Sequence, residues 1–187
     1  MLNWLMGKPK VARTAEALYA RIVDAARQPA FYKDLEVPDT AEGRFEMVAL
    51  HLFQALEALK TGRLDPAYVE AFSRHTIEAF VTDMDDCMRE MGVGDLTVPK
   101  RVKRAAAGFY ERTGVYRAAL SELDNTALLA ALKRYVYQGR DAARPALALA
   151  AYMRTMSIEL AGAPPETMLS STQVPNPANS LDASHAL

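Results

Sequence analysis

Four carboxylates that lie close together in this chain of 187 residues are the first group whose types and spacing could do chemistry. They are Asp83, Asp85, Asp86 and Glu90. Hard cations such as Mg²⁺ prefer several carboxylate oxygens, and positions 83, 86 and 90 share one face of a helix. A helical di-iron site would add Glu-x-x-His pairs, and no histidine in this sequence follows a glutamate by three positions. The pattern therefore favours a solvated acidic face that pairs with Arg89 or with neighbouring cations, and we expect no metal site.

Two histidines inside predicted helices, His51 and His75, are candidates for a general base. Either would need a nucleophile and an orienting carboxylate beside it in space. A partly buried, hydrogen-bonded histidine is the favoured interpretation of each. The sequence contains no G-x-S-x-G elbow, P-loop or dinucleotide fingerprint. We therefore expect no catalytic residue and no cofactor. A metal-dependent enzyme that uses Asp83, Asp86 and a histidine is the alternative.

The single cysteine, Cys87, can form neither an intrachain disulfide nor a multi-cysteine metal site within one chain. Few positive charges share its helical face, so an unreactive packed thiol is favoured over a reactive one. This cysteine usage is compatible with a reducing compartment, and we expect the protein to be cytoplasmic.

A basic run is the strongest charge feature of the sequence. It consists of Lys100, Arg101, Lys103 and Arg104. Clustered cations attract phosphates or an acidic partner, and a solvated face that lowers self-association is the alternative. Because the formal net charge is -1, we expect no DNA binding, and any contact with RNA or anionic lipid would be local.

The elements that must position these residues are helices. Apolar residues recur at helical spacing along nearly the whole chain, and no sustained alternating pattern of β-branched residues occurs. The expected fold is an all-α, single-domain helical bundle of about six to seven helices with a disordered C-terminal tail. We expect an N-terminal segment over residues 1–13, a helical domain over 14–162 and a flexible tail over 163–187.

Capping residues and breakers set the expected helix ends. Asp39 or Thr40 caps the second helix, and the Asp65–Pro66 pair begins the third. We expect an interruption at residues 113–114 to separate a fourth helix from a short fifth one. The apolar link over residues 28–39 is expected to pack against the bundle.

The N-terminal segment MLNWLMGKPK places apolar residues before two lysines and could rest at a bilayer interface. A frayed terminus, or one that docks on the core, is the favoured alternative. No stretch approaches the roughly 20 apolar residues that a membrane-spanning helix needs, and the segment is too short for a signal peptide. A peripheral location on the inner membrane is the alternative to a location free in the cytoplasm.

Three longer motifs stand out in the sequence: D-T-x-E-G-R-F-E-x-x-A-L-H-L-F at residues 39–53, D-M-D-x-x-x-R-E-M-G-V-G-D at 83–95 and V-P-K-x-V-K-R at 98–104. In these motifs the chain resembles the ubiquinol–cytochrome c chaperone family. The resemblance continues more loosely to about residue 152. Tyr135 departs from the family pattern, because relatives often carry Asn at this position. Any polar contact that the Asn makes in relatives is therefore not expected in this chain.

The resemblance implies a non-enzymatic assembly chaperone for the ubiquinol–cytochrome c reductase (bc1) complex. Relatives hold newly made cytochrome b near the ribosome together with a small partner protein, so cytochrome b or another bc1 subunit is the implied client. The basic run is then expected to contact a partner such as a small protein, the ribosome or an anionic membrane. The residues expected to form the core or a client groove are Phe45, His51, Phe53, Phe80 and Met84. The alternative is a general helical module that binds protein or RNA through residues 100–104.

Overall fold

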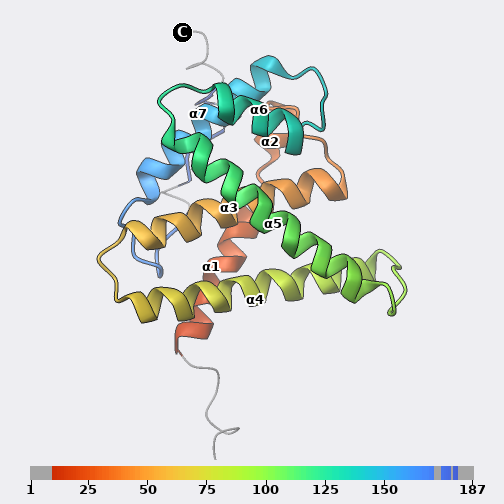
Figure 1. Cartoon of the computed structure of the whole chain (residues 1–187), viewed down its shortest axis with the longest axis vertical. Coiled ribbons are helices and arrows are strands. Elements are labelled where there is room, and N and C mark those ends of the chain that lie inside the picture. Colours follow the sequence, from red (N-terminus) through yellow and green to blue (C-terminus); the bar gives the residue numbers. More distant parts are fainter. Residues whose placement is uncertain (1–9, 171–173, 178, 181–187) are drawn as a thin grey trace, which may run out of the picture.

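The computed structural model describes residues 10–170, 174–177 and 179–180. Within these residues the chain folds into seven helices and has no strand, which confirms the predicted all-α bundle (Figure 1). The helices are α1 (Lys10–Ala26), α2 (Pro29–Lys33), α3 (Ala41–Thr61), α4 (Pro66–Glu90), α5 (Val98–Ser121), α6 (Thr126–Tyr135) and α7 (Ala143–Leu160). No helix in this described part combines the length and apolar character needed to cross a bilayer.

Helix α3 is the centre of the bundle, because its apolar residues surround the helix instead of forming one stripe. Every residue from 46 to 56 is buried. Helices α1, α4 and α7 pack against it, and α5 and α6 complete the shell (Figure 1). The long helices α4 and α5 form a hairpin whose connecting turn projects from one side of the bundle (Figure 1).

Local capping begins both α3 and α4. The Thr40 hydroxyl accepts a hydrogen bond from the amide of Gly43 at 3.1 Å, so Thr40 is the cap of α3. Asp39 pairs instead with Arg44, with its Oδ1 2.6 Å from the Arg44 Nε. Asp65 caps α4 by accepting from the Tyr68 amide at 3.0 Å. The predicted beginnings of these two helices are therefore confirmed.

The link between α1 and α3 packs against the bundle, as the sequence predicts. It contains the short helix α2, and Phe31, Leu35 and Val37 are buried. The Tyr137 hydroxyl donates to the Leu35 carbonyl at 2.9 Å and so ties the link to the residues after α6.

Helix α5 corrects one prediction, because it runs without interruption through Thr113 and Gly114. The Thr113 hydroxyl donates to the Phe109 carbonyl at 3.0 Å, one turn back, instead of capping a new helix. Phe109 and Tyr116 are buried on either side of the expected break. Their burial outweighs the roughly 1 kcal/mol that a glycine costs inside a helix.

Ordered packing continues past residue 162, where the sequence places the start of the flexible tail. Met168 and Leu169 are buried against the core. Arg21 of α1 donates to the carbonyls of Met168 and Pro165 at 2.8 and 2.9 Å. These contacts hold residues 165–169 against the bundle. The N-terminal residues 1–9, for which membrane contact was considered, lie outside the described residues.

Candidate functional site

An open apolar groove of about 820 Å³ lies where the C-terminal end of α3 meets α4 and α5. We call it the α4 groove, because α4 supplies most of its lining. Its apolar side chains are Leu59, Leu64, Val69, Ile77, Val81 and Tyr110, and its charged side chains are Lys60, Glu70, Arg74 and Glu78. The volume falls within the range of ligand-binding pockets.

The sequence periodicity of α4 explains why the groove is open. Phe72, Thr76 and Phe80 lie on the face of α4 that is buried in the bundle. Val69, Ile77 and Val81 lie on a neighbouring face that is only partly covered. From Val69 to Val81 this face extends about 18 Å, at 1.5 Å per residue. The groove is therefore long enough to accept one side of a short helix.

Charged side chains border the apolar part of the groove. The Arg74 Nε and the Glu78 Oε1 are 4.0 Å apart, and the His75 Nδ1 lies 2.9 Å from the Glu78 Oε2. These contacts join exposed side chains one turn apart on the same helix, so they contribute little to the stability of the protein. They leave both signs of charge available at the border of the groove.

His51, Phe53 and Phe80 lie in the core and not in the α4 groove. The His51 Nδ1 lies 2.7 Å from the Met47 carbonyl, to which it donates, and the Tyr152 hydroxyl donates to Nε2 at 2.8 Å. Complete burial lowers the pKa of His51 to about 4, because the charged form would lose its hydration. His51 is therefore neutral at physiological pH and has both ring nitrogens occupied.

Phe45 and Met84, the other two residues expected in a core or groove, are partly buried against the same core. The Phe45 ring lies 6.0 Å from that of Phe80. Neither residue lines the α4 groove. Phe45 and Phe80 meet between α3 and α4. His51 packs instead against Tyr152 of α7, and Phe53 packs against Tyr116 of α5.

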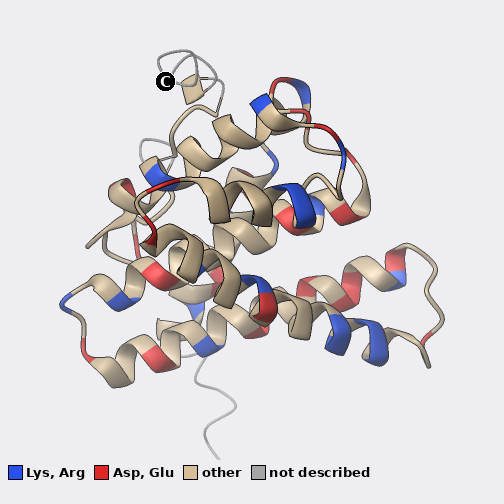
Figure 2. Ribbon diagram, turned by 45° about the horizontal axis from the view of Figure 1, so that its top comes forward, with Lys and Arg blue, Asp and Glu red and all other residues tan. Residues whose placement is uncertain are grey.

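The basic run forms a single exposed cluster on the first two turns of α5. We call Lys100, Arg101, Lys103 and Arg104 the basic cluster. Figure 2 shows the cationic residues at the start of α5 and the carboxylates at the end of α4 as separate charged stretches of the hairpin. No ion pair of a cluster residue is found within the part of the chain that the structure describes.

The acidic residues at the end of α4 have partners of their own. Arg89 pairs with Asp85, Nε to Oδ2 at 2.6 Å, and also with Asp95 in the following turn. Asp83 accepts a hydrogen bond from the Tyr19 hydroxyl at 2.7 Å. No group of three or more potential His, Cys, Asp or Glu metal ligands is present among the described residues.

Cys87 lies beside Asp83, with the thiol 3.9 Å from its Oδ1. Burial raises the pKa of the Cys87 thiol, and the negative charge of Asp83 raises it further. Both effects disfavour the thiolate, which is the reactive form.

A buried ion pair between α3 and α5 was missed by the sequence reasoning. Arg112 donates to both carboxylate oxygens of Glu46, at 2.7 and 2.5 Å. The Arg112 guanidinium also lies 4.7 Å from the ring centre of Tyr135 and 5.6 Å from that of Phe45. Burial raises the pKa of Glu46, while the hydrogen bonds from Arg112 oppose that rise. A lone glutamate inside the apolar run at residues 45–53 was the only available signal.

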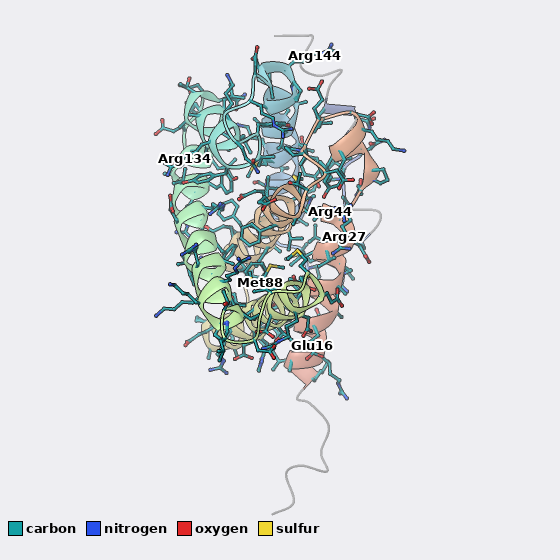
Figure 3. The ribbon with its side chains drawn as sticks, turned by 90° about the vertical axis from the view of Figure 1, so that its right-hand side faces the viewer. Glu16, Arg27, Arg44, Met88, Arg134 and Arg144 are labelled. Carbon is teal, nitrogen blue, oxygen red and sulfur yellow. The ribbon has the colours of Figure 1, made fainter. Side chains whose placement is uncertain are left out.

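Tyr135, the position that departs from the family pattern, belongs to the same cluster. Its hydroxyl donates to the Glu111 Oε1 at 2.9 Å, and Arg134 reaches the same oxygen at 3.2 Å. Figure 3 looks toward the projecting end of the hairpin and shows side chains filling the interior between α3, α4 and α5, with Arg134 at the outer edge. Tyr135 therefore makes a polar contact of its own.

Comparisons with known proteins agree with this architecture. The family described as Ubiquinol-cytochrome C chaperone matches residues 33–174. The crystal structure of the Cbp3 homolog from Brucella abortus is similar, with 39% sequence identity and a TM-score of 0.71 over 84% of this chain and 87% of that chain. No curated protein sequence matches at a significant level. By both its sequence and its fold, the chain belongs to the ubiquinol-cytochrome C chaperone family.

Proposed function

We propose that this protein is a non-enzymatic assembly chaperone of the bc1 complex that holds newly made cytochrome b in the α4 groove. Family membership supports the assembly role. The observation that carries the client-binding part is the groove itself, which leaves apolar side chains of α4 and α5 partly exposed along one side of the bundle.

The groove suits an apolar helix better than a small polar substrate. A helix binds such a groove through residues at positions i, i+3, i+4 and i+7, which span about 10.5 Å and fit within the roughly 18 Å that α4 offers. Cytochrome b is a membrane protein, and its helices need apolar contact until they are inserted. Each 100 Å² of apolar surface that is buried on binding contributes about 2.5 kcal/mol before the entropic cost of association.

The histidines support the non-enzymatic part of the proposal. His51 is neutral, buried and hydrogen-bonded at both ring nitrogens. His75 contacts Glu78 of its own helix on the surface. The basic cluster lies on the first turns of α5, apart from the groove lining, and would serve as a second contact surface for a partner.

Deletion of the gene followed by complementation tests this function. We expect the deletion strain to accumulate less cytochrome b and less bc1 haem in membrane absorption spectra, and the wild-type gene to restore both. Tyr110→Asp should fail to restore them, because it places a charge in the apolar part of the groove where the native side chain is 58% exposed. Leu123→Asp is the matched control, because Leu123 is fully exposed and does not line the groove.

Unchanged cytochrome b in the deletion strain would reject the assembly role. Full restoration by Tyr110→Asp would reject the α4 groove as the client site while leaving the assembly role intact.

A further inference from the structure

The turn between α4 and α5 exposes large apolar side chains at a projecting point of the molecule. Leu96 is 100% exposed and Met91 is 58% exposed. The hairpin extends beyond the rest of the bundle, so both residues lie at its outer end (Figure 1). Apolar side chains held at a projecting point are free to contact another apolar phase.

The basic cluster begins immediately behind these apolar residues. Lys100 follows Leu96 by four positions, and Arg104 lies six residues, or about 9 Å, beyond the first residue of α5. The order from the outer end inward is therefore apolar side chains first and cations one to two turns behind.

Charge pairing around the turn leaves the cations available. Arg89 already pairs with Asp85 and Asp95, so these two carboxylates are partly neutralised. The exposed Asp86 and Glu90 lie on α4, in a stretch separate from the cations of α5 (Figure 2). A negatively charged surface would therefore approach from the α5 side of the hairpin and leave the α4 carboxylates facing away.

We propose that the outer end of the α4–α5 hairpin binds an anionic membrane surface. Leu96 and Met91 enter the boundary between headgroups and acyl chains, and the basic cluster binds the lipid phosphates. Apolar groups at such a boundary lie about 5–10 Å deep, which is comparable to the roughly 9 Å between the first residue of α5 and Arg104. RNA phosphates would also attract the cluster, but RNA offers no apolar phase for Leu96 and Met91. The inference does not depend on the identity of the client.

The test is co-sedimentation of the purified full-length protein with lipid vesicles. We expect binding to mixed phosphatidylglycerol and phosphatidylcholine vesicles, and little binding to vesicles of phosphatidylcholine alone. Substitution of all four cluster residues by Gln should weaken binding at least about tenfold, because each cation near an anionic surface contributes severalfold. Leu96→Ser combined with Met91→Ser should weaken binding severalfold while the dependence on salt concentration stays the same.

A second quadruple variant separates local charge from net charge. It replaces four exposed cations elsewhere, Lys33, Arg63, Lys133 and Arg140, by Gln. This variant should bind the anionic vesicles nearly as well as the wild type. Circular dichroism of every variant checks that the fold is intact, and none of the substituted side chains belongs to the buried core.

Three outcomes would overturn the proposal. One is equal binding to neutral and anionic vesicles, and another is equal loss of binding in the two quadruple variants. The third is binding of a single-stranded RNA oligonucleotide that competes with the vesicles and is unaffected by the Leu96 and Met91 substitutions, which would assign the surface to RNA.

Discussion

Arg112 of α5 reaches into the bundle and forms a two-point ion pair with Glu46 of α3, across 66 positions of sequence. The side chains of Arg112 and Glu46 are 18% and 6% exposed. The pair joins the central helix to one arm of the projecting hairpin, and the rings of Phe45 and Tyr135 lie against the guanidinium. It fixes the position of α5 relative to the core.

Loss of one partner of this pair should destabilise the protein strongly. We expect Arg112→Met to lower the free energy of unfolding by roughly 3–5 kcal/mol, because Glu46 would remain buried without compensation. Urea unfolding followed by circular dichroism measures the change. The control is Arg117→Met, which breaks the half-exposed pair with Glu57 and should cost at most about 1 kcal/mol. Similar losses in the two variants would contradict this interpretation.

His51 should make the protein less stable as the pH falls below neutrality. The unfolded chain takes up a proton near the ordinary His pKa of 6.5, whereas the folded protein resists protonation until about pH 4. Protons therefore favour the unfolded state between these values, and stability is lost at up to about 1.4 kcal/mol per pH unit. Urea unfolding of the wild type and of His51→Gln across this window isolates the contribution.

The wild type should show a steeper fall in stability toward low pH than His51→Gln. Parallel pH profiles of the wild type and His51→Gln would show that His51 is not the group responsible.

Two glycine substitutions should have opposite effects. A Cβ at Gly43 would lie 1.9 Å from the Pro38 carbonyl oxygen, so Gly43→Ala requires the backbone to move and should destabilise the protein. Gly114 lies inside α5 with no foreign atom within 4 Å of such a Cβ. Gly114→Ala should therefore stabilise the protein by about 0.5–1 kcal/mol. Thermal unfolding distinguishes the two, and a gain of stability in Gly43→Ala would disprove the close approach.

The contacts of Arg21 should control the order of the segment that follows α7. Arg21→Ala removes the donors to the carbonyls of Pro165 and Met168. We expect faster amide hydrogen exchange over residues 165–170, with little change in α3. Arg13→Ala on the same helix is the control, because Arg13 is exposed. Unchanged exchange in the Arg21 variant would show that burial of Met168 alone holds the segment.

The sequence predicted the parts of the fold that depend on neighbouring residues. Thr40 and the Asp65–Pro66 pair begin α3 and α4 as expected, and Gly92 takes the left-handed φ of +77° that ends α4. These signals are local, because a cap or a glycine satisfies backbone groups within a few residues of itself. The buried character of α3 was also evident from its apolar residues.

The parts that were missed depend on contacts between distant segments. Gly114 looked like a break, but the burial of Phe109 and Tyr116 carries α5 across it. The α4 groove could not be predicted, because hydrophobic periodicity does not show which apolar face of a helix remains uncovered. Met168 likewise contacts Arg21, which lies 147 positions earlier in the chain.

The enclosure of α3 by its neighbours limits how the proposed chaperone could bind and release a client. A helix that is buried from residue 46 to 56 cannot rotate or slide without breaking the whole bundle. A client of the proposed chaperone would therefore bind and leave by exchange at the surface, while the interior of the bundle stays constant.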